Sequence, residues 1–213
     1  MNEAMLSAIT QCVVEGDIDS IVQSVNQAIT DGIPAKTILN VGLIDGMNEV
    51  GALFKDGEMF VPEVLMSAKT MQMGIEVIRH LLVTEGVGRR GRIITATVEG
   101  DLHDIGIKLV GMMLEGAGFE VINIGVDVPA TTIIEKVIEL KPDIIGMSAM
   151  LTTTMVKMKD VMDMLEEHGL LNSTKVMIGG APVSDVYANK IGAVYSDDAV
   201  SAVAAAKNIL NLS

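Results

Sequence analysis

The sequence predicts an α/β protein in which a bundle of four helices precedes a doubly wound, five-stranded parallel sheet. Residues 1–85 carry apolar residues at helical spacing, interrupted by short polar breaks. From Arg92 onward, apolar β-branched runs alternate with helical patterns, and a glycine-rich stretch without periodicity lies between the two regions. We therefore predict a helical domain at 1–85, a linker at 86–91 and an α/β domain at 92–213.

The helical region divides into four segments, expected near 3–15, 18–30, 34–54 and 62–82. Gly16-Asp17 separates the first two, and Asp17 is placed to N-cap the second helix. That second helix carries one apolar stripe, formed by Ile18, Ile21, Val22, Val25 and Ile29. Pro34 and Pro62 stand in the first turns of the third and fourth helices, where proline is tolerated. Short loops between four amphipathic helices indicate an antiparallel bundle.

The second region reads as five strand-and-helix units. The predicted strands are 92–98, 120–125, 143–148, 174–179 and 193–196, and the predicted helices are 105–116, 131–140, 154–168, 183–190 and 198–211. This alternation implies parallel strands with right-handed crossovers. The flavodoxin-like strand order 2-1-3-4-5 is expected, with ligands binding at the carboxyl ends of the strands.

Composition narrows the classes of function. The 213-residue chain has a net charge of −13, which argues against nucleic acid and anionic membranes as partners. The N-terminus lacks the basic and apolar parts of a signal peptide, and no apolar run has the length of a membrane span. Cys12 is the single cysteine, which excludes an internal disulfide and a cysteine-based zinc site. We expect a cytoplasmic protein in which Cys12 is a small apolar filler.

Four loops should share one rim of the sheet. The first carries Asp101, His103 and Gly106, and the third runs from Ser148 to Thr154. The fourth holds Gly179-Gly180-Ala181 and the fifth holds Ser196 to Ala199. A zinc site would need three or four protein ligands, and no phosphate-binding Gly-Lys-Ser/Thr follows any strand. The rim suits a cofactor that brings its own metal and takes one axial ligand.

His103 is the candidate for that ligand. One interpretation is a loop histidine that only hydrogen-bonds Asp101 or Asp104. The other is a metal ligand whose second ring nitrogen is held by a carboxylate, which fixes the tautomer.

The loop residues resemble the motif of the cobalamin-binding proteins. Asp101-Leu102-His103-Asp104-Ile105-Gly106 matches Asp-x-His-x-x-Gly. The spacer 107–147 leads to Ser148-Ala149-Met150, where the family has Ser-x-Leu, and the spacer 151–178 leads to Gly179-Gly180. Methionine is close to leucine in volume and polarity, so its presence at 150 is expected to cost little.

The resemblance implies a role for each residue. His103 would be the lower axial ligand of cobalt, Asp101 would accept its other N–H, and Thr154 would either continue this relay or N-cap a helix. Ser148 and Thr152 would hydrogen-bond the nucleotide tail or ring amides. Close approach of the tail, or simple turn geometry, would explain the glycines Gly106, Gly179 and Gly180. The remaining residues expected beneath the ring are Gly100, Leu102, Asp104 and Ala199.

A second resemblance lies in the helical region. Residues 45–54 and 59–64 are similar to the helical cap that precedes the corrinoid domain in methionine synthase and in small corrinoid proteins. It implies that Phe54, Val61 and Val64 lie over the methyl face of the cofactor, although these residues also suit an ordinary bundle core. A cap must move aside for transfer, so we expect a hinge at 84–91.

Together the resemblances imply a corrinoid methyl carrier with no catalytic residue of its own. It would hold cobalamin or a related corrinoid, alternating between methylcob(III)alamin and cob(I)alamin. Its partners would be a donor-specific methyltransferase, a second methyltransferase acting on a thiol or pterin, and a corrinoid reductive activase. The alternatives are the cobalamin subunit of a radical mutase, a B12-dependent sensor and a plain flavodoxin-like domain. Mutase subunits usually lack this cap, and sensors usually carry a DNA-binding segment.

Overall fold

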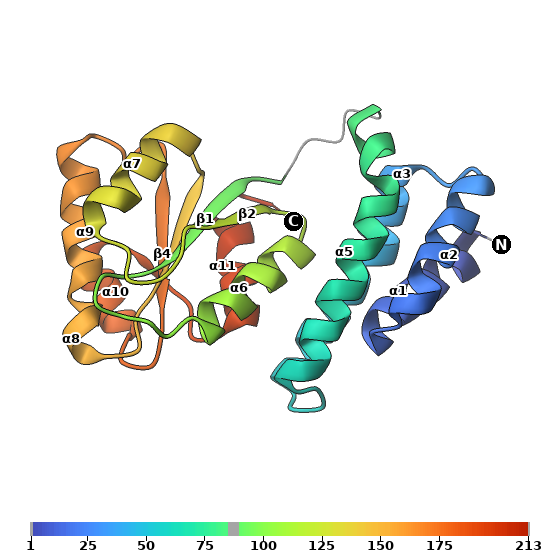
Figure 1. Ribbon diagram of the computed structural model, residues 1–213, viewed down its shortest axis with the longest axis horizontal. Coiled ribbons are helices and arrows are strands. Elements are labelled where there is room, and N and C mark those ends of the chain that lie inside the picture. The colour runs from blue at the N-terminus through green and yellow to red at the C-terminus, as the bar shows by residue number, and fades with distance from the viewer. Residues whose placement is uncertain (1, 85–89, 213) are drawn as a thin grey trace. The chain divides into compact units, whose positions relative to one another are not determined.

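The computed structural model describes residues 2–84 and 90–212, which fall into two compact units (Figure 1). One unit holds the helices before residue 85, and the other holds the α/β elements after residue 89. Most of the predicted hinge at 84–91 and most of the predicted linker at 86–91 lie outside the described residues. No helix within the described ranges is both long enough and apolar enough to span a membrane.

The helical unit contains α1 (Asn2–Glu15), α2 (Ile18–Thr30), α3 (Ala35–Thr37), η1 (Ile38–Ile44), α4 (Asp45–Lys55) and α5 (Val61–Thr84). The Asp17 carboxylate accepts hydrogen bonds from the backbone N–H groups of Asp19 and Ser20, so the predicted N-cap of α2 is confirmed. Cys12 is buried in α1, as expected, and burial raises the pKa of its thiol.

The third predicted helix differs from expectation in its middle. Residues Ile38–Ile44 form a π-helix between α3 and α4, instead of a uniform α-helix. The Thr10 hydroxyl of α1 lies 3.2 Å from the Val41 carbonyl oxygen and 3.1 Å from that of Gly42. A side chain from another helix therefore satisfies carbonyls in the π-helical segment, which apolar periodicity alone does not reveal.

The α/β unit has the predicted strand order, β2-β1-β3-β4-β5, with every pair parallel. Its strands are β1 (Arg92–Thr97), β2 (Glu120–Asn123), β3 (Ile144–Ser148), β4 (Lys175–Gly179) and β5 (Val194–Tyr195). Its helices are α6 (Ile105–Gly116), α7 (Ala130–Leu140), α8 (Thr152–Met155), α9 (Lys157–Glu167), α10 (Asp185–Ile191) and α11 (Ala199–Ile209). The predicted helix 154–168 thus begins two residues earlier and is divided into α8 and α9.

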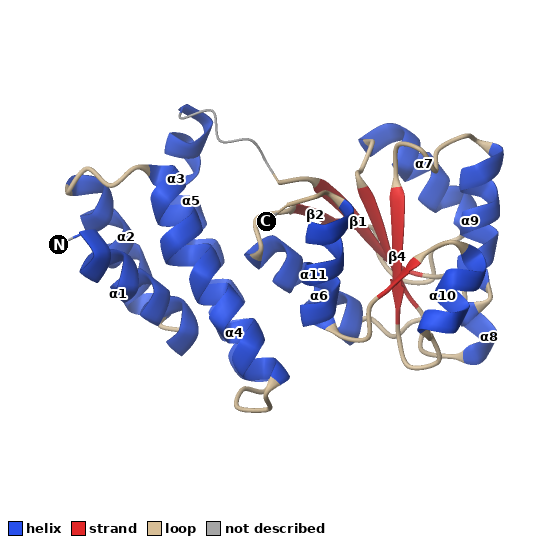
Figure 2. Cartoon of the chain, turned by 180° about the vertical axis from the view of Figure 1, so that it is seen from behind, coloured by secondary structure: helices blue, strands red, loops and turns tan. Residues whose placement is uncertain are grey.

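Helices cover both faces of the sheet (Figure 2). Side chains alternate between the faces of each strand. One face joins α7 and α9 in an apolar core whose strand residues include Ile94, Ala96, Ile145 and Met147. The opposite face ends in a row of Thr97, Ser148 and Gly179, which are paired across β1, β3 and β4. Hydroxyl groups and bare backbone, instead of bulky apolar groups, therefore stand at the carboxyl edge of the sheet.

Candidate cofactor site at the carboxyl edge of the sheet

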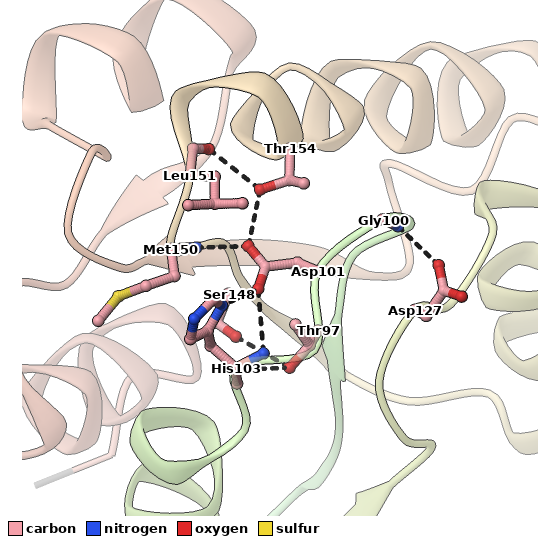
Figure 3. A network of polar contacts seen from close by, with 9 residues as sticks. All are labelled: Thr97, Gly100, Asp101, His103, Asp127, Ser148, Met150, Leu151 and Thr154. Carbon is pink, nitrogen blue, oxygen red and sulfur yellow. Dashed lines mark hydrogen bonds and ion pairs between the residues drawn. The ribbon is translucent and has the colours of Figure 1, made fainter.

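Asp101 is the centre of a polar network that joins two loops of the sheet (Figure 3). Its side chain is fully buried. Oδ1 accepts from the backbone N–H of His103 at 3.0 Å and lies 2.8 Å from His103 Nδ1. Oδ2 accepts from the backbone N–H of Met150 at 2.6 Å and from the Thr154 hydroxyl at 2.7 Å. Four hydrogen bonds occupy the acceptor sites of an ionised carboxylate.

These contacts determine the charge of Asp101. Burial acts to raise the pKa of its carboxyl group. Hydrogen bonds from Thr154, from the Met150 backbone and from His103 outweigh burial and hold that pKa well below its usual range. Asp101 is therefore a carboxylate at neutral pH, and it can only accept hydrogen bonds.

The carboxylate sets the tautomer of His103. Because Asp101 Oδ1 is an acceptor, the hydrogen of a neutral imidazole must lie on Nδ1, and the lone pair lies on Nε2. The His103 side chain is 57% exposed, while the side chain of its partner is fully buried. This geometry matches a metal-binding histidine whose second nitrogen is held by a carboxylate.

Thr154 takes part in this network from α8. Its hydroxyl lies 2.7 Å from Asp101 Oδ2 and 3.0 Å from the Leu151 carbonyl oxygen. The N-cap residue of α8 is Leu151, and Thr154 lies inside the helix. The alternative interpretation of Thr154 as a helix N-cap is therefore wrong, because the helix begins earlier than expected.

The backbone of Met150, and not its side chain, makes the contact with Asp101. The side chain is half exposed at the rim, where Leu102 and Leu151 are also exposed. The substitution of methionine for the family's leucine therefore leaves the hydrogen bond intact. Exposed apolar side chains beside His103 suit the contact surface of a large planar ligand.

The other predicted residues occupy different parts of the rim. The Ser148 hydroxyl lies 3.2 Å from that of Thr97, and Thr152 begins α8 in an exposed position. Ala199 is buried at the first position of α11. The Asp104 carboxylate pairs with Lys108, and this pairing lowers the pKa of the Asp104 carboxyl group.

The glycines of the motif differ in what their positions require. A Cβ at Gly180 would lie 1.9 Å from the Ala149 carbonyl oxygen, and one at Gly179 would lie 2.7 Å from that of Ser196. Close backbone packing within the protein therefore accounts for both. A Cβ at Gly106 would meet no atom within 4 Å, so nothing in the described structure requires glycine there. An open position beside His103 is what a bound cofactor would need.

Among the described residues, no group of three or more His, Cys, Asp or Glu side chains could hold a bare metal ion. His103 offers a single nitrogen, Nε2, while a buried carboxylate holds its Nδ1, and exposed apolar side chains lie nearby. The residues present therefore fit a metal complex that brings its other ligands with it.

Comparison with known proteins identifies the family. A model of the B12 binding domain matches residues 91–205, and a second B12 binding domain model matches residues 5–79. Dimethylamine corrinoid protein 1 of Methanosarcina acetivorans is 43% identical over 210 residues, which cover 98% of each chain. The chain belongs to the B12-binding corrinoid protein family. Its fold agrees with this membership. A plain flavodoxin-like domain, the alternative interpretation, would leave both family matches unexplained.

Solved structures resemble this corrinoid family member along most of its length. The methanol:cobalamin methyltransferase complex of Methanosarcina barkeri contains a chain that is 31% identical, with a TM-score of 0.86. That match covers 98% of this chain and 80% of the other. A cobalamin-binding protein of Desulfitobacterium hafniense is 32% identical with a TM-score of 0.80, and the match covers 96% and 98% of the two chains.

The residues predicted to cover the methyl face lie in the helical unit. Val64 in α5 is fully buried, as expected of bundle core, while Phe54 in α4 and Val61 in α5 are half-buried. Their predicted role over the cofactor stays a prediction.

Sequence reasoning missed three features of this candidate site. The Thr97 hydroxyl lies 3.3 Å from the His103 carbonyl oxygen, and the Met150 N–H binds Asp101. Asp127, in the loop after β2, contacts Gly100. None of the three belongs to a recognisable motif. Thr97 lies inside a strand, the Met150 group is a backbone amide, and Asp127 lies in a loop that the predicted rim did not include. The pairing of β1 with β3 and β2 brings Met150 and Asp127 to the loop that carries Asp101.

Proposed function

We propose that this chain is a corrinoid methyl carrier whose cobalt is axially ligated by His103. The observation that carries the proposal is the contact between the exposed His103 ring and the buried Asp101 carboxylate. Full-length similarity to corrinoid proteins and to a chain of a methanol:cobalamin methyltransferase complex supports the carrier role over a mutase subunit or a sensor.

The methyl donor is proposed to be a small methylated amine, since the relative at 43% identity is a dimethylamine corrinoid protein. The partners would be a donor-specific methyltransferase, an acceptor-side methyltransferase acting on a thiol or pterin, and a reductive activase. The surface is acidic, with a net charge of −13, and would suit basic faces on these partners. The cytoplasm is the proposed compartment.

Each residue of the network has a distinct task in this proposal. The corrinoid, when bound, supplies the cobalt that accepts and releases the methyl group. His103 offers the Nε2 lone pair because Asp101 holds the Nδ1 hydrogen. Thr154 and the Met150 N–H hold the carboxylate in place. A His103 ring that is not bound to the metal would have a free Nε2 to take up a proton, and the Asp101 carboxylate would lie beside the resulting positive charge.

Ser148, Thr152 and the open position at Gly106 are proposed to contact the rest of the cofactor. Gly100, Leu102, Asp104 and Ala199 are proposed to line its lower side, and the backbone at Gly179 and Gly180 to lie against the tail. Leu102 is exposed and apolar, which suits contact with a ring.

Reconstitution with cob(II)alamin under reducing conditions tests the proposal. The purified protein should stay coloured after desalting, and its cobalt EPR signal should show splitting by one ligating nitrogen. With cobalamin labelled with 15N in its own base, that splitting should remain a 14N pattern, because the nitrogen is the protein's. His103→Ala should lose the 14N pattern and bind cobalamin more weakly.

His168→Ala is the matched control, because His168 is an exposed histidine whose Nδ1 contacts the Met164 carbonyl at the end of α9. It should leave colour and splitting unchanged. A wild-type protein that stays colourless, or a His103→Ala protein that keeps the splitting, would remove the ligand assignment. Methylation of the reduced, loaded protein by methylamine- and methanol-specific methyltransferases then identifies the donor.

A further inference from the structure

The loop after β2 lies against the loop that carries Asp101 and His103. Its backbone continues alongside the end of β1. The Thr97 N–H donates to the Gly125 carbonyl at 3.0 Å, and the Val128 N–H donates to the Thr97 carbonyl at 3.1 Å. Val98 and Val128 form an isolated parallel bridge. These anchors hold Asp127 beside the turn that follows β1.

Gly100 occupies a turn that leaves its N–H without a partner inside the turn. The Asp101 N–H donates to the Val98 carbonyl at 3.1 Å, which closes a four-residue turn. Gly100 is the third residue of this turn and has φ +81°, the conformation that a type II turn requires at this position. The turn's own hydrogen bond does not involve the Gly100 N–H, so the acceptor for this N–H, a side chain or water, comes from outside the turn.

Asp127 supplies that acceptor and makes a second contact in return. Its Oδ1 accepts from the Gly100 N–H at 2.6 Å (Figure 3). Its own N–H donates to the Asp101 carbonyl at 3.0 Å. The two bonds bracket the Gly100–Asp101 peptide. Asp127 has φ +52°, a left-handed conformation that aspartate and asparagine adopt more readily than most residues.

We propose that Asp127 is a positioning residue for the cobalt ligand. It fixes the backbone at Gly100 and Asp101, so it determines where the Asp101 carboxylate stands, and that carboxylate orients the His103 ring. Asp127 acts through the backbone of Gly100 and Asp101, which it contacts directly. This inference rests on the proposed ligation of cobalt by His103. It predicts that the loop after β2, which lies outside the recognised motif, controls the fraction of cobalt that is bound by His103.

Two substitutions distinguish the effect of the Asp127 carboxylate from the effect of its backbone conformation. Asp127→Gly removes the acceptor and adopts positive φ without strain. Asp127→Asn keeps a side-chain oxygen and also tolerates positive φ. Lys141→Gly is the matched control, because Lys141 has φ +48° at the end of α7 and the same glycine is introduced away from the site.

The first measurement needs no cofactor. Hydrogen exchange at the Gly100 amide, followed by NMR in the cofactor-free protein, should be roughly fivefold faster in Asp127→Gly, as expected for losing one solvent-accessible hydrogen bond. The second measurement uses protein loaded with cob(II)alamin. The ratio of histidine-bound to histidine-free cobalt in the EPR spectrum should fall by a similar factor, roughly fivefold. Asp127→Asn should restore most of both effects, and Lys141→Gly should show neither.

The outcomes distinguish this inference from the proposed function. If wild-type protein shows protein nitrogen on cobalt and Asp127→Gly shows the same ratio, the positioning role is wrong and the ligation by His103 stands. An equal fall in Lys141→Gly also overturns it, since the effect would then belong to glycine in general. Absence of protein nitrogen in the wild type overturns the proposed ligation and this inference together.

Discussion

Replacing Asp101 with asparagine should cost more than one hydrogen bond. The carboxylate accepts four hydrogen bonds, two on each oxygen, at 2.6–3.0 Å. An asparagine keeps one oxygen and places an NH2 group where the other stood. If this NH2 group points toward His103, it faces the backbone N–H of His103. If it points the other way, it faces the backbone N–H of Met150. Either orientation leaves a partly buried backbone donor, of His103 or of Met150, without its acceptor.

The size of the effect follows from this count. A buried donor left without a partner costs about 1–3 kcal/mol, and each charge-assisted bond that becomes neutral weakens by about 1 kcal/mol. We expect Asp101→Asn to lower the free energy of unfolding by about 3 kcal/mol at pH 7. In the orientation that places its NH2 group against Nδ1, it should also impair ligation, because the NH2 group favours the tautomer with hydrogen on Nε2, which leaves no lone pair there for a metal.

The loss should depend on pH with a definite sign. The folded-state pKa of Asp101 lies below its unfolded value, which is about 3.9. Its ionised form therefore stabilises the protein above that unfolded value, and the contribution is lost as pH falls below it. Asparagine does not titrate. The difference in the free energy of unfolding between wild type and Asp101→Asn should be largest near pH 7 and should narrow below about pH 4.

Urea unfolding of the cofactor-free protein measures this gap. The chain has two tyrosines and no tryptophan, and Tyr187 and Tyr195 both lie in the α/β unit, so tyrosine fluorescence follows that unit alone. Asp104→Asn is the control and should leave the transition nearly unchanged, because Asp104 forms only a partly exposed pair with Lys108. A loss at pH 7 below about 1 kcal/mol, or a gap that does not narrow on acidification, would refute the reasoning.

Three further changes test the rim. Gly106→Ala should stabilise the cofactor-free protein by up to about 1 kcal/mol, since its Cβ enters open space in a helix, yet weaken cobalamin binding as measured by titration. Gly180→Ala should cost about 3 kcal/mol or more, because its Cβ would lie 1.9 Å from the Ala149 carbonyl oxygen at φ +122°; an unchanged urea midpoint would contradict this. Met150→Leu should alter stability by about 0.5 kcal/mol or less and leave the visible spectrum of the loaded protein unchanged, since the Met150 backbone makes the contact with Asp101.

Local patterns in the sequence carried much of this protein's architecture. Apolar periodicity and polar breaks were enough for most of the helices and strands and for the N-cap at Asp17, because each depends on residues a few positions apart. The strand order followed from the alternation of strands and helices along the chain, together with the topology that such chains adopt. The contact between Asp101 and His103 belongs to the same class, since His103 lies two positions after Asp101 in a short loop. The interruption of the third helix by a π-helical segment was not visible, because Thr10 of another helix supports it.

Only the tertiary structure decided what surrounds Asp101. Met150 and Thr154 reach its carboxylate across 49 and 53 positions of sequence, and Asp127 reaches the adjoining backbone from a different loop. These residues meet in space because β1 pairs with β3 on one side and with β2 on the other, in one particular register. A motif shows which side chains offer the right chemistry. The pairing of strands decides which backbone groups complete their hydrogen bonds, and therefore how firmly the histidine is held.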